Sequence, residues 1–240
     1  MAENVQKESF ADKLNASLAK SSKALLAAAI IVVVAFVAVL VVSNVKSNLA
    51  KKGLEQIDSI TYALTRESGN SGDIENSDIS EDEKDAKKAE DKAARQKTAL
   101  EQLAPLASKS GIVGVRANML IADIKFDQKN YSEARDAYVK AAELEKAYTR
   151  SLNDFNAGVC SEELDDNESA IKYYKAASDD KDFVLIDHAL FSLGRVYEAS
   201  SSFEDAKAAY EKLNDLHPTT SWGQMAKSRL IALKAEGKIQ

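Results

Sequence analysis

The chain has 240 residues, of which 29% are charged and 45% hydrophobic, with only 9 Gly and 2 Pro. So few turn-forming residues exclude an all-β sandwich or barrel, which needs a turn after every short strand. The one Cys excludes an intramolecular disulfide and a cysteine-built zinc cluster, and the net charge of −6 argues against a general nucleic-acid binder. Stretches rich in Ala, Glu and Lys predict an all-α protein.

Residues 24–42 form a run of 19 apolar residues without a charge, a Gly or a Pro. At about 1.5 Å per residue, a helix of this length spans the hydrocarbon core of a bilayer. We expect a short tail over 1–23 and a transmembrane helix over 24–43. Two alternatives stay open. A cleaved signal sequence usually has a shorter apolar region and a small-residue cleavage site, and a buried soluble helix would need apolar partners on every side.

The charges on either side of the run favour a cytoplasmic N-terminus and an exported C-terminal domain. Residues 1–23 carry four Lys and a net charge of +1, whereas the chain after the run carries −7. Positively charged flanks tend to stay in the cytoplasm, although three Lys also follow the run closely. A domain that faces the cytoplasm is the alternative.

Two segments separate the apolar run from the rest of the chain. Residues 44–66 keep apolar side chains at helical spacing, which predicts a juxtamembrane helix. Residues 67–82 hold six acidic residues and no basic ones among Gly, Ser and Asn, so we expect a flexible acidic linker. Ser80 and Glu83 fit a capping box that opens a charged helix, and Pro105 is expected to end or kink that helix.

Three later segments repeat with a fixed period. Ala134, Ala170 and Ala206 are spaced by 36 and 36 residues. Four residues after each stands a Tyr, and twelve residues before each stands a small residue: Tyr138, Tyr174 and Tyr210, and Ala122, Gly158 and Gly194. We expect the small residues to let two helices approach closely and the aromatic rings to fill the space between neighbouring repeats. One such unit cannot bury its apolar face alone, so the units should stack.

This pattern resembles the tetratricopeptide repeat (TPR), a pair of antiparallel helices repeated about every 34 residues. The third copy carries most of the family's positions, namely Leu193, Gly194, Tyr197, Ala206, Tyr210 and Pro218. The first two copies are degenerate, and Lys125 stands where the family often has Tyr.

The resemblance implies an all-α, TPR-like helical-repeat solenoid over residues 83–240. About three repeats are expected, at 115–148, 151–182 and 187–218. Half-repeats or caps are expected to flank them. A C-terminal cap helix is expected over 221–236, opened by a capping box of Ser221 and Gln224.

The sequence holds no motif of an enzyme, a cofactor site or a metal site. Cys160 occupies the repeat position of Ile124 and Val196, so we interpret it as a small core residue. His188 and His217 have no ligand or nucleophile pattern around them and are interpreted as surface or capping residues. No catalytic residue, cofactor, small-molecule substrate or nucleic acid is predicted.

The predicted partners are other proteins, with the membrane contacted through one helix. In stacked helical repeats the first helices line a concave groove, where a peptide segment would dock. The predicted groove residues are Arg116, Met119, Asp123, Phe126, Leu152, Phe155, Val159, Glu162, Phe191 and Arg195, with His188 and Glu198 at equivalent positions. The alternative is that the helix at 221–234 or the segment 44–66 fills this groove.

A short tail, one anchor and an exported repeat domain together resemble the YfgM-like ancillary subunits of the bacterial SecYEG translocon. That resemblance implies a single-pass protein of the bacterial inner membrane with a periplasmic domain. It would be an interaction scaffold of the cell envelope that serves protein translocation or periplasmic chaperones. The alternative function is a cytoplasmic-facing membrane adaptor that recruits soluble proteins through its repeats.

Overall fold

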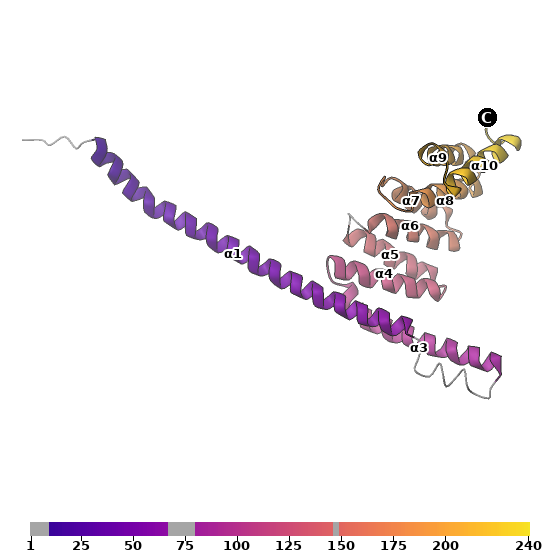
Figure 1. Cartoon of the computed structure of the whole chain (residues 1–240), viewed down its shortest axis with the longest axis horizontal. Coiled ribbons are helices and arrows are strands. Elements are labelled where there is room, and N and C mark those ends of the chain that lie inside the picture. The colour runs from indigo at the N-terminus through magenta and orange to yellow at the C-terminus, as the bar shows by residue number, and fades with distance from the viewer. Residues whose placement is uncertain (1–9, 67–79, 146–148) are drawn as a thin grey trace, which may run out of the picture. The chain divides into compact units, whose positions relative to one another are not determined.

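The computed structural model describes residues 10–66, 80–145 and 149–240. Every regular element in these ranges is a helix, so the all-α prediction is confirmed for them (Figure 1). The chain divides into two compact units, Met1–Lys52 and Gly53–Gln240. The expected linker falls almost wholly at 67–79, outside the described residues.

The long helix α1 (Phe10–Thr65) runs through the first unit as far as Lys52. Its last turns, from Gly53 to Thr65, belong to the second unit. The stretch Ile30–Thr65 has an apolar window of mean hydropathy 2.4, none of it buried. It is the one helix in the described part of the chain long and apolar enough to cross a membrane, and it fits an anchor or a signal sequence. The helices expected at 24–43 and 44–66 are thus one continuous helix, in which no Pro stands.

Helix α3 (Glu81–Ala107) begins at the predicted capping box. The Ser80 side chain accepts a hydrogen bond from the Glu83 backbone N–H, and the Glu83 carboxylate accepts one from the Ser80 backbone N–H. Pro105 does not end the helix near Ala104 as expected. It lies in the last turn, where only one backbone hydrogen bond is lost, so the helix continues to Ala107.

The second unit begins at Gly53, upstream of the boundary expected at residue 83. Ile57 is 1% exposed and Ile60 is 6% exposed, so this end of α1 buries its apolar side in the repeat unit. A Cβ placed on Gly53 would lie 2.8 Å from the side chain of Val113, and a guanidinium nitrogen of Arg95 on α3 donates to the Leu64 carbonyl at 3.0 Å. The end of α1 therefore takes the place of an N-terminal capping helix.

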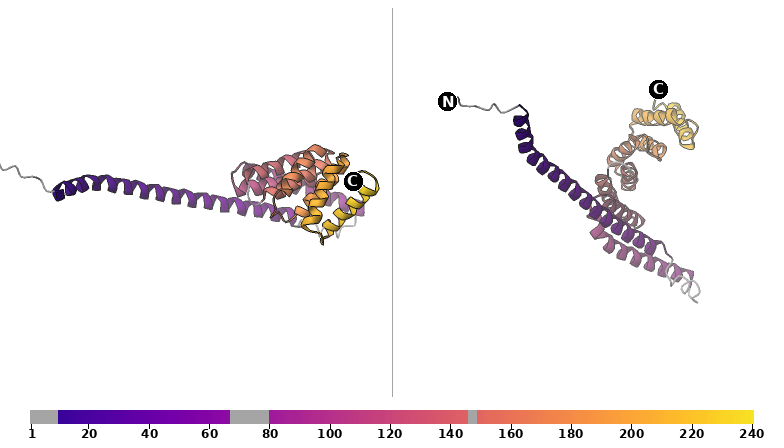
Figure 2. Two further views of the ribbon diagram at one scale, coloured as in Figure 1. Left: turned by 90° about the horizontal axis from the view of Figure 1, so that it is seen from above. Right: turned by 60° about the vertical axis from the view of Figure 1, so that its left-hand side comes forward.

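The rest of the unit is a series of helix pairs that stack in chain order (Figures 1 and 2). The pairs are α4 (Ile112–Asp127) with α5 (Tyr131–Leu144), α6 (Arg150–Glu163) with α7 (Asn167–Ser178), and α8 (Ile186–Ala199) with α9 (Phe203–Leu216). Helix α10 (Ser221–Ala235) follows and packs on α8 and α9. Its N-cap is Thr220, whose hydroxyl accepts from the Gly223 N–H, and not Ser221 as expected.

The turn inside each pair has the same backbone geometry. Lys129, Asp165 and Ser201 have positive φ angles of 59°, 55° and 58°, and they are spaced by the repeat period of 36 residues. This left-handed residue reverses the chain after the first helix, and the next N–H reaches back to a carbonyl of the last helical turn. The equal turns give the three pairs the same internal register.

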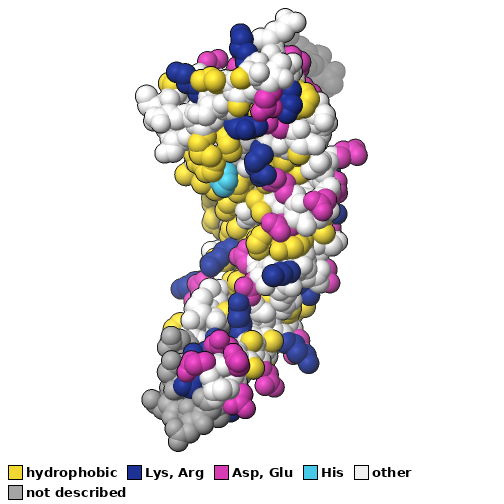
Figure 3. Space-filling model, turned by 90° about the vertical axis from the view of Figure 1, so that its right-hand side faces the viewer, with side chains coloured by type: hydrophobic (Ala, Val, Ile, Leu, Met, Phe, Trp, Pro, Cys, Tyr) yellow, Lys and Arg dark blue, Asp and Glu magenta, His cyan; other side chains and the backbone are white. Residues whose placement is uncertain are grey.

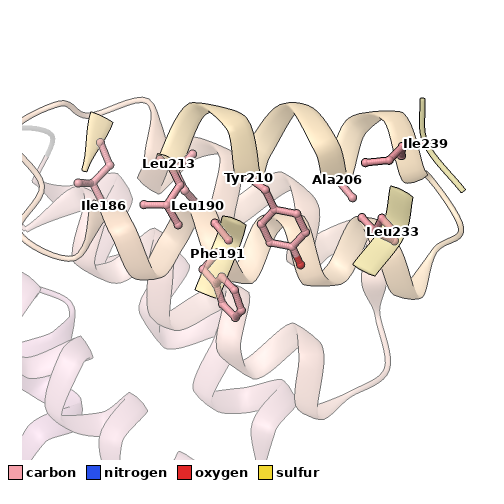
Figure 4. Packing of buried hydrophobic residues seen from close by; sticks show 9 residues of the cluster. Ile186, Leu190, Phe191, Ala206, Tyr210, Leu213, Leu233 and Ile239 are labelled. Atoms are coloured by element: carbon pink, nitrogen blue, oxygen red, sulfur yellow. The ribbon is translucent and has the colours of Figure 1, made fainter. Parts of the chain in front are cut away.

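The small residue and the tyrosine of each copy meet inside the pair. A Cβ placed on Gly158 would lie 2.7 Å from the ring of Tyr174, and one on Gly194 would overlap the ring of Tyr210. Tyr174 also shares a buried cluster with Leu193 of the next pair, as expected of a residue between neighbouring repeats. Figure 4 shows the equivalent cluster around Tyr210, with side chains from α8, α9 and α10.

Candidate partner-binding face

The predicted groove residues lie on the first helices of the pairs, but two of them belong to the core. Phe155 is 6% exposed and Phe191 is 8% exposed, which contradicts their expected role as exposed anchors. Both side chains pack against the tyrosine of their own pair, with ring centroids 5.5 Å apart for Phe155 and Tyr174 and 5.6 Å apart for Phe191 and Tyr210. The helical spacing alone could not predict that Phe155 and Phe191 are buried against an aromatic ring of the second helix.

The other predicted residues reach the surface. Asp123 and Arg195 are exposed, and the remainder are half-buried: Arg116, Met119, Phe126, Leu152, Val159, Glu162, His188 and Glu198. We call this side of the repeat unit the first-helix face. It comprises these residues together with Trp222 and Met225 of α10, which sequence reasoning did not place there.

Three aromatic rings form a row across successive first helices. The ring of His188 on α8 lies 4.9 Å from that of Phe155 on α6 and stacks at 4.4 Å on that of Trp222 on α10. Burial, with Arg195 nearby, lowers the pKa of His188 below its ordinary 6.5, so this ring is neutral at neutral pH. His188 therefore acts here as an aromatic surface. The sequence feature that could have placed Trp222 on this face is its position 34 residues after His188, close to the repeat period.

Exposed apolar side chains flank this row. Leu185 is 37% exposed and lies one turn before His188, and Met225 is 45% exposed and lies one turn after Trp222. Figure 3 shows hydrophobic side chains gathered beside a histidine on one face of the molecule, with charged side chains next to them. Rigid rings bordered by flexible apolar side chains suit the binding of another apolar group.

Carboxylates on the first helices tie the pairs together. Glu162 accepts a hydrogen bond from the Tyr174 hydroxyl at 2.5 Å, and Glu198 accepts one from the Tyr210 hydroxyl at 2.6 Å. Each also binds an arginine of the next first helix. Arg195 lies 2.7 Å from Glu162, and the Arg229 Nε donates to Glu198 at 3.0 Å. These Tyr–Glu–Arg triads were not predicted, although Glu162 and Glu198 are one period apart in the sequence.

Two elements contact the ends of the face. At one end, Asp58 of α1 pairs with Arg116 at 2.9 Å, and at the other, Trp222 of α10 lies against His188 and Phe191. These contacts come from α1 and α10, the two segments named in the alternative that the chain fills its own groove, and that alternative stays an expectation. The section around Met119, Phe126, Leu152 and Val159 lies between them.

Other features do not point to chemistry at this face. Burial raises the pKa of the Cys160 thiol to about 12, as fits the core residue expected there. A pocket of about 430 Å³ lies between the end of α1 and α3, and shares Ile60 and Gln102 with a neighbouring one of about 230 Å³. In the described part of the chain, no cluster of three or more His, Cys, Asp or Glu could hold a metal ion.

Comparison with known proteins agrees with this geometry. Two models of the tetratricopeptide repeat match the chain, over residues 115–148 and 188–220. This protein contains tetratricopeptide repeats. The matched segments coincide with the pairs α4–α5 and α8–α9, and the pair α6–α7 between them has the same turn and the same Gly–Tyr contact. Such repeats are typically non-catalytic and bind other proteins.

A relative in Treponema pallidum (strain Nichols), described as a TPR repeat-containing protein, is 34% identical to this chain over 139 residues. The match covers 58% of this chain and 58% of the relative, which is less than two thirds of the relative's length. It supports the repeat assignment and names no partner.

Proposed function

We propose that this TPR protein is a membrane-anchored scaffold that binds segments of other proteins on its first-helix face. The observation that carries the proposal is the stacked pair of His188 and Trp222, with exposed Leu185 and Met225 beside it. Apolar side chains of a partner would pack on the rings and lose contact with water, which is the usual source of affinity at small interfaces.

The exposed apolar residues provide the test. Tagged full-length protein is purified from membranes, and co-purified proteins are identified by mass spectrometry for wild type and for the double variant Leu185→Asp, Met225→Asp. Because two charges beside the rings oppose apolar docking, we expect the double variant to lose partners that the wild type retains. The triple truncation of Phe126, Phe155 and Phe191 is unsuitable, because the last two side chains are part of the core.

Two matched controls separate binding from stability. Leu164 is 38% exposed and Leu216 is 48% exposed, and both lie at helix ends outside the first-helix face. Leu164→Asp and Leu216→Asp should retain the partners. Partners that survive the double variant, or that are lost equally with the controls, would contradict the proposal.

The setting of this scaffold is a finer part of the proposal. We place it in the bacterial inner membrane with the repeat unit in the periplasm, in support of protein translocation or of periplasmic chaperones. The support is the layout of the sequence: an apolar helix candidate, an N-terminal tail of charge +1 and a repeat unit beyond it. Protease added to spheroplasts should digest the repeat unit. Full protection would instead indicate the cytoplasmic adaptor.

A further inference from the structure

The first pair places its carboxylate at a different repeat position. The residue one period before Glu162 is Phe126, and Asp123 stands one turn earlier on α4. Asp123 on α4 accepts a hydrogen bond from the Tyr138 hydroxyl at 2.5 Å, as Glu162 and Glu198 do from their own tyrosines. Those two glutamates also bind an arginine of the next first helix. Within the described ranges, no ion pair joins Asp123 to a cation.

The reason lies in the residues that α6 offers. Val159 stands one repeat period before Arg195, so α6 has an aliphatic side chain at the position of that arginine. The residue that stands 33 places after Asp123, as Arg195 does after Glu162, is Asn156. Asn156, one turn earlier on α6, is uncharged. Asp123 is exposed as a whole residue, but partial desolvation of its carboxyl group raises the pKa above its ordinary value, and the Tyr138 hydrogen bond opposes the rise.

Nearby cations of α4 are already engaged. Lys125 lies 2.7 Å from Glu133 of α5, and Arg116 lies 2.9 Å from Asp58. Next to Asp123 on α4 stand half-buried Met119 and Phe126, about one turn away on either side. This section of the first-helix face thus combines one uncompensated anion with apolar surface.

We propose that the section of the first-helix face around Asp123, Phe126 and Val159 binds a partner segment that carries a Lys or Arg beside an apolar side chain. The partner's cation would pair with Asp123, in the way that Arg195 pairs with Glu162 between α6 and α8. Its apolar neighbour would pack on Phe126 and Val159. The inference rests on the proposed function, and it adds the charge of the partner.

A peptide selection tests the inference. Full-length protein in detergent micelles is used to select from a phage-displayed library of random peptides, and the selected peptides are synthesised for affinity measurement by fluorescence anisotropy. We expect a basic residue next to an apolar one to recur among them. Asp123→Asn keeps an acceptor for Tyr138 and removes the charge, so it should weaken the binding of these peptides by about tenfold.

A double-mutant cycle distinguishes pairing from a structural effect. Changing the peptide's Lys or Arg to Gln should weaken binding to wild type by the same factor and should have little further effect on Asp123→Asn. Asp136→Asn, at an exposed position of α5, is the control and should bind as wild type does.

Each outcome is decisive. Selected peptides that are acidic or uncharged, or basic peptides whose affinity is the same for wild type and Asp123→Asn, would overturn the inference. The proposed function would survive if the double variant Leu185→Asp, Met225→Asp bound those peptides more weakly than wild type does. Failure of every peptide to bind wild type would count against both.

Discussion

Single residues set the distance between the helices of a pair. Gly158 and Gly194 leave the space that the rings of Tyr174 and Tyr210 occupy, and the tyrosine hydroxyls then reach Glu162 and Glu198. Each tyrosine thus packs between the two helices of its own pair and also orients the glutamate that binds an arginine of the next pair or of α10. A change at the glycine should disturb both functions.

The substitution Gly194→Leu tests this packing. A side chain at this position would overlap the Tyr210 ring, so we expect the free energy of unfolding to fall by about 1–3 kcal/mol. The fluorescence of Trp222, the one Trp of the chain, reports urea unfolding of this region. Ala208→Leu, at an exposed position of α9, is the control, and an equal midpoint for wild type and Gly194→Leu would show that the glycine is not a packing residue.

The triad at Glu198 should make stability depend on pH. Burial alone would raise the pKa of Glu198, but hydrogen bonds from Arg229 and Tyr210 outweigh it and lower the pKa below the ordinary 4.5. The native state thus binds this proton less readily than the unfolded state. The stabilisation is therefore fully present above pH 4.5 and is lost as the pH falls through the lower, native pKa.

Glu198→Gln should remove this contribution. The free energy of unfolding, measured by Trp222 fluorescence across the acidic range, should fall less steeply for the variant than for wild type. Glu204→Gln is the control, since Glu204 is an exposed residue of α9. Equal slopes for wild type and Glu198→Gln would show that the triad does not hold a charged carboxylate.

At the scale of elements, the sequence predicted the positions of helices best in the part of the chain that repeats with one period. The spacing of 36 residues located the three pairs, and Ser80 with Glu83 located the start of α3. It did not predict that Phe155 is buried, because only contacts with the second helix and with the next pair decide that. Nor did it predict that the end of α1 completes the repeat unit, since that depends on packing between segments far apart in sequence.

The capping role of α1 can be tested at Ile57, whose side chain is 1% exposed. We expect Ile57→Ala to destabilise the packing of this end of α1 by about 2–5 kcal/mol. Hydrogen exchange of the full-length protein should become faster in α3 and α4, and stay unchanged in α8 and α9. Ala63→Ser, at an exposed position of the same helix, is the control, and unchanged exchange in α4 for Ile57→Ala would contradict the capping role.

At the scale of the whole molecule, a scaffold of this kind needs its apolar helix to stay in the membrane. The exposed side chains of the Ile30–Thr65 stretch include Ile31 and Val32, each 67% exposed, which water would not favour. We therefore predict that the mature protein retains residues 24–42 and resists extraction from membranes by carbonate. A mature N-terminus after residue 43 would show a signal sequence instead.

The most direct test of the central claim is a photo-crosslinking scan of the full-length protein in its own cells. A photoreactive amino acid is placed at Met119, Leu152 or Met225 on the first-helix face, and at Lys140 or Glu211 as exposed positions of the second helices. The account predicts protein adducts from the first three positions and few from the last two. Adducts confined to the second-helix positions, or none from the first-helix face, would contradict it.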